Sequence, residues 1–413
     1  MDIKMIDGKI IQPELEIPII EDVDTLIIGG GVAGVAAAIS SAREGASNLL
    51  IERYGFLGGM VTGGLVLRLE GFGDGEKMVV KGIAEEIVER LDAMGGAKRL
   101  GYDITVDPEL LKILLFRMVE EAGVKLLLHS LVVETLVEDK RVKGVIIENK
   151  SGRGALLGKV VIDASGDGDV FARASAEFAT GQRGFGIIFR LSGVDHSEVE
   201  RFRTEKQDEY NTVIEEVKGL LGFPILGSGE IARGFVWWSN MTSPKDGLDI
   251  FELSQQEVLI RENILRAVKL AKEKIPGFGQ AQFVQTASQF GVRETRRLIG
   301  RFILTEENIK KGSRFEDAIA HAGYGGTPGV GYDIPYGCLV PKEIDGLIVA
   351  GRCISSDEFS QNFLRVVANC LATGQGAGTA AALSLKDGVT PRDVNITKLK
   401  TQLKQQGVYL LGS

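Results

Sequence analysis

The sequence predicts an α/β fold in which a mostly parallel sheet is interrupted by a second domain. A strand, a glycine-rich turn, a helix and another strand follow one another over residues 24–52, which is a βαβ unit. Buried-strand patterns that meet glycine recur at residues 159–163 and 346–351, far apart in the chain. Residues 176–329 differ in texture, with longer charged helices and both tryptophans. We therefore expect the later strand to return to the first sheet after an inserted α+β domain.

The first half of the chain alternates strands and helices. Gly45 stands at the usual C-terminal glycine position of the first helix, and Pro108 stands in the first turn of a later one. Lys140 and Arg141 mark a hairpin between two short strands. Strands are predicted at 24–28, 48–52, 125–128, 131–137, 142–148 and 159–163, and helices at 35–44, 74–93 and from Pro108 onward. In the second half, helices are predicted at 197–218, 254–274 and from about Ala372, with a strand at 346–351.

Composition excludes several classes of protein. The 413 residues carry a formal net charge of −8, because 56 Asp and Glu outnumber 48 Lys and Arg. Nucleic-acid binding rewards basic surface, so an acidic chain is a poor candidate for it. Three cysteines without a C-x-x-C pair, and only three histidines, disfavour a disulfide framework or a multi-histidine metal site. We expect no metal, no nucleic-acid partner and a reduced, cytoplasmic protein.

Two uncharged runs, at 25–42 and 366–385, are about long enough to span a bilayer. Both are rich in Gly, Ala, Ser and Thr rather than Leu and Ile, and neither has aromatic belts. The chain also has 54 glycines without a Gly-X-Y period, which indicates tight turns and backbone held close to ligands. We therefore interpret both runs as helices packed against a cofactor, and we expect no membrane partner.

A dinucleotide-binding fingerprint lies in the βαβ unit. Gly29, Gly31 and Gly34 form G-x-G-x-x-G between a strand and a helix, and Glu52 closes the second strand. Gly29 permits the tight turn, Gly31 lets the backbone approach a pyrophosphate, and Gly34 lets the helix pack closely on the strand. The helix N-terminus attracts phosphate, and Glu52 would hydrogen-bond the ribose hydroxyls. A plain glycine turn is the alternative, which this complete context disfavours.

Three further glycine-rich regions decide between FAD and NAD. They are residues 53–60, residues 163–169, and the pair 350–352 and 373–378. A nicotinamide dehydrogenase usually completes its site within one contiguous unit, whereas these regions suit a longer cofactor spread over an interrupted domain. Residues 163–168 also mimic the start of a calcium loop, but the twelfth position is Ala174 and lacks the bidentate carboxylate. The pattern favours FAD.

These regions carry a family resemblance over roughly residues 20–390. The chain resembles the FAD-dependent oxidoreductases of the glutathione-reductase-like superfamily, in particular the group near xanthan lyase and heterodisulfide-reductase-like flavoproteins. The resemblance implies a three-layer, Rossmann-like FAD/NAD(P)-binding fold with a central parallel sheet, a β-meander and an inserted α+β substrate domain. It rests on the motifs Glu52–Gly59, Val161–Asp167, Asn240–Thr242, Gly291–Arg297, Phe315–Ala320, Ala350–Cys353 and Cys370–Gly378. The expected domains are a discontinuous FAD-binding domain (22–175 and 330–390), a substrate or cap domain (176–329) and a C-terminal tail (391–413).

The resemblance also implies where the cofactor binds. Gly58 and Gly59 would lie along the flavin, Val132 would touch adenine through its backbone, and Arg352 would face the pyrophosphate. A helix beginning near Thr373 would point its N-terminus at the flavin, where the helix dipole stabilises negative charge. The full set of expected cofactor-binding residues is Gly29, Gly31, Val32, Ala33, Gly34, Glu52, Arg53, Gly58, Gly59, Met60, Val132, Ala164, Ser165, Gly166, Gly351, Arg352, Thr373, Gly374 and Gln375.

Arg293, Arg296 and His321 are the candidate catalytic residues. An arginine of the 293–297 cluster would hold a substrate carboxylate or stabilise developing negative charge. A structural salt-bridge cluster is an equally good explanation, and on a regular strand Arg293 and Arg296 would face opposite sides. His321 precedes a glycine-rich stretch and would act as a mobile acid or base, although a lone histidine is more often structural.

Other distinctive residues have simpler explanations. Asn240 and Thr242 would hydrogen-bond a substrate or, slightly better, form a turn before a proline. Trp237 and Trp238 suit a core or an interface, and Cys353 suits packing. Two histidines that are frequent in the group are absent here, since residues 355–359 and 323–329 carry other side chains. That absence keeps a non-redox role of the flavin open.

The sequence therefore predicts an enzyme with non-covalently bound FAD, in a cleft between two domains. It would transfer a hydride between a small organic substrate and the flavin, whose electronics the protein tunes by position and charge. No second dinucleotide fingerprint is visible, so the electron donor or acceptor would be a separate molecule. A protein that binds FAD structurally is the first alternative, and an NAD(P)-dependent dehydrogenase is the second.

Overall fold

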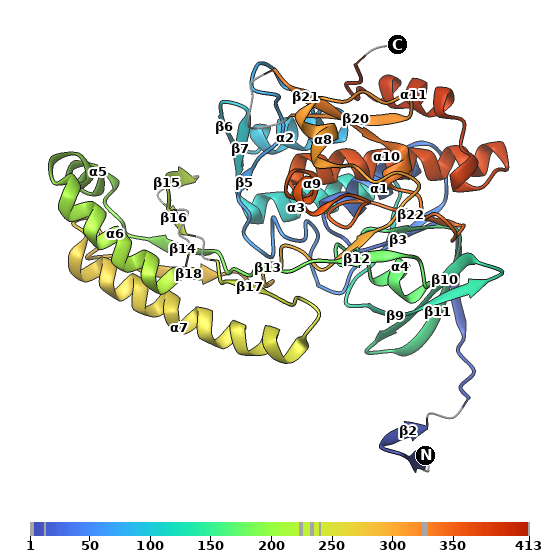
Figure 1. The fold of residues 1–413 in the computed structure, drawn as a ribbon, viewed down its shortest axis with the longest axis horizontal. Coiled ribbons are helices and arrows are strands. Elements are labelled where there is room, and N and C mark those ends of the chain that lie inside the picture. Colours follow the sequence, from blue (N-terminus) through green and yellow to red (C-terminus); the bar gives the residue numbers. More distant parts are fainter. Residues whose placement is uncertain are drawn as a thin grey trace.

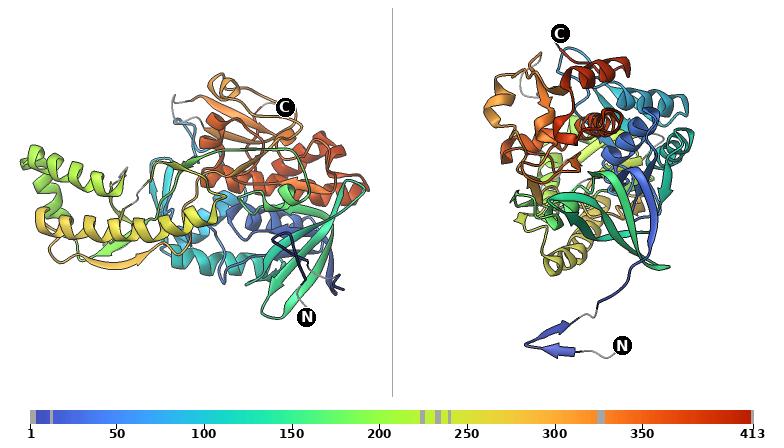
Figure 2. Two further views of the ribbon diagram at one scale, coloured as in Figure 1. Left: turned by 60° about the horizontal axis from the view of Figure 1, so that its bottom comes forward. Right: turned by 90° about the vertical axis from the view of Figure 1, so that its right-hand side faces the viewer.

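The chain forms a large lobe and a narrower one that projects from it (Figure 1). The computed structural model describes residues 4–11, 14–222, 226–231, 235–238, 241–323 and 329–411. Near the N-terminus, β1 (Lys4–Ile6) and β2 (Lys9–Ile11) form a hairpin that stands away from the large lobe (Figure 2). The large lobe combines a central, mostly parallel sheet with helices, which is the α/β fold class that the sequence predicts.

The central sheet brings together strands from distant parts of the chain. Its order is β8, β4, β3, β11, β10 and β9, and β22 also pairs with β11. The long strand β11 is antiparallel to β10 along 152–157 and parallel to β22 at 161–163. The strand expected near 346–351 therefore does return to the first sheet. The bounds are β3 (Ile19–Ile28), β4 (Asn48–Ile51), β8 (Lys125–Leu127), β9 (Leu131–Glu138), β10 (Arg141–Asn149), β11 (Gly152–Asp163) and β22 (Leu347–Val349).

Two helices built from small residues pack closely against each other beside this sheet. They are α1 (Val32–Arg43) and α10 (Val367–Asp387), and almost every residue of α10 is buried. The two helices can touch through their backbones because a Cβ at Gly374 would overlap the Ala33 carbonyl, and one at Gly378 would overlap that of Ala37. The two uncharged runs of the sequence thus contribute to this interface. Among the described helices, none is long and apolar enough to cross a membrane.

The narrower lobe has a hydrophobic core of its own. Helices α6 (Gln207–Leu221) and α7 (Ile250–Lys274) pack over a sheet of the order β15, β16, β14, β18. Leu65 and Leu67, from the large lobe's part of the sequence, also enter this core. The remaining elements of the lobe are α5 (His196–Glu205), β13 (Arg183–Gly184), β14 (Phe189–Ser192), β15 (Leu226–Ile231), β16 (Phe235–Trp238), β17 (Pro244–Lys245) and β18 (Gln282–Thr286).

Residues 298–322 pack with the large lobe rather than with the narrower one. Leu298, Ile319 and Ala322 belong to the core of the central sheet, and β20 packs against α10. The expected boundary at residue 329 thus does not coincide with the change of core. Further elements of the large lobe are α2 (Ile83–Ala93), α3 (Pro108–Glu121), α4 (Asp169–Arg173), α8 (Glu306–Lys310), α9 (Glu358–Leu364), α11 (Ile396–Gln405), β5 (Arg68–Leu69), β6 (Ala97–Leu100), β7 (Asp103–Val106), β12 (Phe178–Thr180), β19 (Arg296–Leu298), β20 (Ala318–Gly323) and β21 (Gly331–Pro335).

Three predicted helices differ from the structure for local reasons. The helix expected over 74–93 begins only at Ile83, because Gly82 adopts a φ of 70° and the Asp74 carboxylate accepts hydrogen bonds from the N–H groups of the following loop. The helix expected over 197–218 divides into α5 and α6 at Lys206, which is not helical. The helix expected near Ala372 starts at Val367, after an extended Val366.

The effect of replacing a helical glycine by alanine depends on what the added methyl group meets, and two glycines of this structure differ in this respect. Gly378→Ala would place a methyl group on the Ala37 carbonyl, so we expect the protein to lose about 1–3 kcal/mol of stability. Gly219→Ala, in α6, meets nothing within 4 Å, so it should be neutral or stabilising by roughly 0.5–1 kcal/mol. Urea unfolding monitored by circular dichroism gives both values. A stable Gly378→Ala variant would contradict the close approach of the two helices.

Candidate functional site: two adjoining cavities

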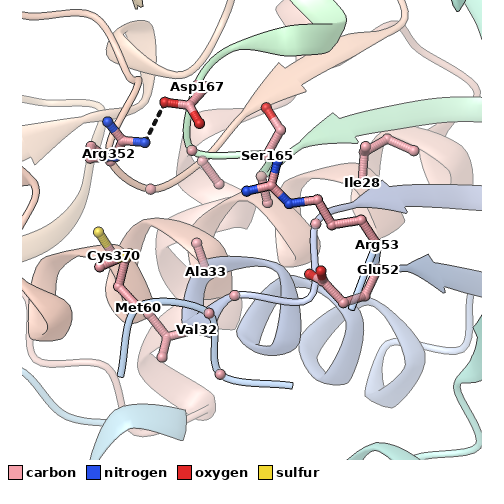
Figure 3. Close-up of a pocket in the computed structure, with 18 of the residues that line it drawn as sticks. Ile28, Val32, Ala33, Glu52, Arg53, Met60, Ser165, Asp167, Arg352 and Cys370 are labelled. Atoms are coloured by element: carbon pink, nitrogen blue, oxygen red, sulfur yellow. Dashed lines mark hydrogen bonds and ion pairs between the residues drawn. The ribbon is translucent and has the colours of Figure 1, made fainter. Parts of the chain in front are cut away.

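A cavity lies at the carboxyl ends of the parallel strands β3, β4, β11 and β22, where ligands bind in open α/β sheets. Its empty space, part of which is open to solvent, amounts to about 1090 Å³. Figure 3 shows Glu52 and Arg53 at one end of the cavity and Met60 and Cys370 at the other. Segments near residues 29, 52, 58, 131, 165, 351 and 367 contribute to its lining.

The turn after β3 is shaped by three glycines. Gly29 has a φ of 102°, and a Cβ there would lie 2.5 Å from the Ala164 carbonyl oxygen. A Cβ at Gly34 would overlap the Gly29 carbonyl, so α1 sits directly against the turn. A Cβ at Gly31 would instead meet only the Gly59 Cα, at 4.0 Å, because this residue lines the cavity. The first N–H groups of α1 have no side-chain cap, which leaves them available to an anion.

Glu52 is a buried carboxylate at the end of β4. Its Oε2 accepts a hydrogen bond from the Gly30 N–H at 2.6 Å, and its Oε1 accepts one from the Tyr54 N–H at 2.8 Å. These bonds fix the carboxylate beside the glycine turn while each oxygen keeps a second lone pair. Glu52 lines the cavity and is 7% exposed. It is therefore placed to accept hydrogen bonds from hydroxyl groups of a bound molecule.

The loop after β11 is held by a buried aspartate. Asp163 accepts hydrogen bonds from Ser165 through Oδ1 and from the N–H groups of Val170 and Phe171 through Oδ2, at 2.6–3.0 Å. Burial raises the pKa of its carboxyl. In the part of the chain that the structure describes, no group of His, Cys, Asp or Glu is placed to hold a metal ion.

An ion pair joins the β11 loop to the segment after β22. The Arg352 Nη2 lies 2.5 Å from the Asp167 Oδ1, and Figure 3 shows the pair at the cavity. Burial alone would raise the pKa of Asp167, but Arg352 and a hydrogen bond from Thr295 outweigh it and lower that pKa. The Arg352 Nη1 is buried and has no hydrogen-bond partner. A donor left without a partner at a cavity wall is suited to an acceptor on a ligand.

The structure brings together most of the expected cofactor-binding residues. All of them line the cavity except Gly34, Thr373, Gly374 and Gln375. Because α10 starts at Val367, the last three lie within the helix and face other parts of the protein. Thr373 Oγ1 accepts a hydrogen bond from the Gly351 N–H, and Gln375 accepts one from the Ile83 N–H. The residues near the N-terminus of α10 that line the cavity are Val367 and Cys370.

A second cavity adjoins the first and shares Met60, Arg352, Arg365 and Val367 with it. Its walls come from the segment after Met60, from residues 186–188, from 291–293 and from the start of α10. Arg293 lines this cavity and donates a hydrogen bond to the Gly184 carbonyl at 2.7 Å. Burial lowers the pKa of Arg293 to about 10, with further contributions from Arg365 and Arg183, and the side chain remains protonated near neutral pH.

The other two candidate catalytic residues lie elsewhere. Arg296 contacts the Asp167 carbonyl and the Asp169 carboxylate, and it does not line either cavity. His321 is buried in β20, where its Nδ1 lies 2.8 Å from the Asp333 Oδ1. The expectation that His321 is mobile is wrong, because its place in β20 and its hydrogen bond to Asp333 hold the side chain in the interior.

The remaining singled-out side chains have structural surroundings. Thr242 donates to the Ser243 carbonyl and accepts from the Phe185 N–H at 2.9 Å. Cys353 is buried, and burial raises the pKa of the cavity-lining Cys370 thiol to about 12, so neither is a thiolate near neutral pH. Asn240 lies outside the described residues, as do the side chains of Trp237 and Trp238.

Sequence reasoning missed Arg365 and the true N-terminus of α10. Arg365 follows α9 and precedes the extended Val366, so it stands at the junction of two helices and lines both cavities. It belongs to no motif. The one sequence signal is that it is the last charge before the uncharged run of residues 366–385.

Comparison with known families gives a match along almost the whole chain. The profile of the family described as FAD dependent oxidoreductase matches residues 24–403. Among curated proteins, the thiamine thiazole synthase of Aeropyrum pernix is 28% identical over 166 residues, which are 37% of this chain and 58% of that protein. The thiamine thiazole synthase of Pyrococcus abyssi is 31% identical over 126 residues, 30% of this chain and 47% of that protein. The chain thus spans about half the length of these relatives.

Solved structures with a similar fold include a geranylgeranyl bacteriochlorophyll reductase-like protein from Thermoplasma acidophilum. It has a TM-score of 0.50 and 14% identity, covering 94% of this chain and 84% of that chain. The myxobacterial chondrochloren halogenase, described as FAD-dependent, has a TM-score of 0.50 and 15% identity, covering 94% of this chain and 79% of that one. At identities this low, the structural similarity shows a shared fold alone.

Because the cavity is open beside Gly31, a side chain at this position is predicted to change the affinity for FAD. Gly31 has ordinary backbone angles, with φ −65° and ψ 177°, so valine would fit the backbone but would fill the cavity beside the N-terminus of α1. We expect Gly31→Val to weaken FAD binding at least roughly tenfold, or about 1.4 kcal/mol. Fluorescence titration of the apoprotein with FAD measures this change. Gly279→Val, where a Cβ meets nothing within 4 Å, is the control, and equal affinity in both variants would contradict the cradle.

Proposed function

The chain belongs to the family of FAD-dependent oxidoreductases, and we propose that it holds FAD in the first cavity and its substrate in the second. In this proposal a hydride passes between a small organic substrate and FAD, where the two cavities share Met60, Arg352, Arg365 and Val367. Bound FAD supplies the redox centre that accepts or donates the two electrons. The protein supplies position, charge and exclusion of water.

The observation that carries this proposal is the order of polar groups along the first cavity. Glu52 stands at one end with lone pairs to accept hydrogen bonds from ribose hydroxyls. The uncapped N–H groups of α1 and the Arg352 Nη1, which has no partner among the described residues, supply hydrogen-bond donors for a pyrophosphate, and the dipole of α1 supplies partial positive charge. These groups fit a dinucleotide that carries a diphosphate between two sugar-like segments.

The far end of the cavity suits the flavin. Gly58, Gly59 and Met60 line it together with the N-terminus of α10, which has no side-chain cap. The positive end of this helix dipole would stabilise negative charge on a reduced flavin. We assign the flavin to this end and the adenosine to the end beside Glu52 and Val132.

Within the family, we place the chain in the group near xanthan lyase and heterodisulfide-reductase-like flavoproteins, on the motifs Ala350–Cys353 and Cys370–Gly378. We assign the covering domain to about 183–291, because this stretch builds the core of the narrower lobe. The three buried, unpaired cysteines support a reducing, cytoplasmic location. A separate molecule would serve as electron donor or acceptor. The partial matches to thiamine thiazole synthases support no proposal about the substrate.

The visible absorption spectrum of the purified protein tests the cofactor site. We expect a flavin spectrum. We also expect heat denaturation to release FAD into the supernatant, because in this proposal FAD is bound non-covalently. Under anaerobic conditions the bound flavin should be reduced by candidate organic donors and reoxidised by an added acceptor. The absorbance of the oxidised flavin, at about 450 nm, would be followed in both steps.

Two outcomes would contradict the proposal in different ways. A colourless protein that cannot be reconstituted with FAD, but that binds a nicotinamide dinucleotide, would support an NAD(P)-dependent dehydrogenase. A protein that holds FAD firmly but whose flavin no organic donor or cellular reductant reduces would indicate a structural role for FAD. The described lining of the second cavity contains no histidine, lysine or tyrosine. A lack of these common proton carriers would be the physical basis of this second outcome.

A further inference from the structure

The second cavity combines apolar walls with a cluster of arginines. Val66, Ile188, Val292 and Val366 contribute to the walls, and Arg68, Arg293, Arg352 and Arg365 line the same space. Glu70 is the one carboxylate among its described lining residues. Arginine next to apolar surface is an arrangement that orients a ligand with one anionic and one apolar part.

Two of the four guanidinium groups already have carboxylate partners. The Arg68 Nη2 lies 2.6 Å from the Asp103 Oδ2, and the Arg352 Nη2 lies 2.5 Å from the Asp167 Oδ1. Their charges are therefore compensated within the protein. Neither pair needs an anion from the cavity to balance it.

Arg293 and Arg365 differ from these two. In the described part of the chain, Arg293 makes no ion pair, and its guanidinium donates to the neutral Gly184 carbonyl. The Nε of Arg365 is buried without any hydrogen-bond partner, and its side chain forms no ion pair with a described residue. Buried charges are normally paired, because removing them from water is costly. Arg293 and Arg365 are neighbouring, partly buried cations without a counter-ion among the described residues, so an anion bound between them would be stabilised.

The surroundings do not supply that anion. Arg183 lies close enough to lower the pKa of both arginines, but its own charge is taken up by Glu294 at 2.5 Å. Burial is the main reason that the pKa of Arg365 is lowered. Glu70 stands at the rim with 60% of its side chain exposed, so water screens its charge. Positive potential remains inside the cavity.

We propose that this cavity binds the carboxylate group of an organic acid with an apolar body, and that Arg293 and Arg365 are the residues that hold the carboxylate. This inference rests on the proposed function and names the substrate class of its second cavity. Two guanidinium groups suit a carboxylate, which carries one charge and accepts bidentate hydrogen bonds. A phosphate monoester presents three acceptor oxygens, and the apolar walls offer them few further donors. The shared lining would place the acid beside the cofactor.

Binding of carboxylates to the FAD-loaded protein tests the proposal. The probes are acetate, butanoate, hexanoate and octanoate, each compared with its uncharged amide and with propyl phosphate. Isothermal titration calorimetry gives the affinity, and the difference spectrum of the flavin reports whether the probe lies beside it. We expect a longer acid to bind more tightly than acetate, and each acid to bind at least roughly tenfold more tightly than its amide, since a charged hydrogen bond is lost with the amide.

Four substitutions locate the carboxylate. Arg293→Met and Arg365→Met keep an unbranched stem that reaches about as far as Nε and remove the charged end, and each should weaken hexanoate binding at least roughly tenfold while hexanamide binding stays within about twofold. Arg68→Met is the matched control, since it lines the same cavity but its charge is already paired. Arg293→Lys should recover part of the affinity because the charge returns. Circular dichroism melting identifies any variant that fails to fold, in which case the lysine variant carries the test.

The outcomes separate this inference from the proposed function. If the wild-type protein does not retain FAD, the proposed function fails and the inference fails with it. If the wild-type protein and the variants retain FAD equally, but acids bind no better than amides or Arg68→Met is as damaging as Arg293→Met, the inference alone is overturned. Loss of FAD in Arg365→Met alone would assign Arg365 to the cofactor and overturn its role as a carboxylate ligand. Tighter binding of propyl phosphate than of butanoate would overturn the choice of carboxylate.

Discussion

Close contact between backbones is the constraint on which the rest of this structure depends. The turn after β3 lies against α1 because Gly34 has no side chain under the Gly29 carbonyl, and α10 lies against α1 because Gly374 and Gly378 have none. With these helices so close, the N-termini of α1 and α10 both reach the first cavity. Much of the cofactor cradle is therefore main chain, and it needs few side chains with special chemistry.

Charge is distributed differently around the two cavities. In the first cavity, the carboxylate of Asp167 pairs with Arg352, and one nitrogen of that arginine remains without a partner. In the second, Arg293 and Arg365 line a space with apolar walls and have no carboxylate partner among the residues that the structure describes. Since burial makes unpaired charge costly, each excess donor indicates the kind of group that a ligand must present. In our proposal, the first cavity binds a diphosphate and the second a carboxylate.

The sequence was most informative where the chemistry is local. The strand, glycine turn, helix and acidic residue of residues 24–52 lie within one short segment, and the structure brings parts of that segment and of the glycine-rich regions 53–60, 163–169 and 350–352 to one cavity. The start of α10 could not be predicted, because its glycines resembled a helix boundary while tertiary packing on α1 accommodates them inside the helix. His321 was misjudged because its carboxylate partner, Asp333, comes from the neighbouring strand. Arg365 was missed because its distinguishing feature is the lack of an ion-pair partner among the described residues. Spacing along a sequence does not reveal such a lack.

The position of β11 at the centre of the sheet has a consequence for the order in which the protein folds. Its residues 161–163 need β22, and β22 begins only at Leu347. At ordinary rates of synthesis, roughly ten seconds or more pass between the emergence of the two strands from the ribosome. During that interval the nascent chain has an open sheet edge and lacks α10, while residues 183–291 are themselves being synthesised. Protection of that edge, by a chaperone or by transient contacts of the nascent chain, would decide the yield of folded protein in the cell.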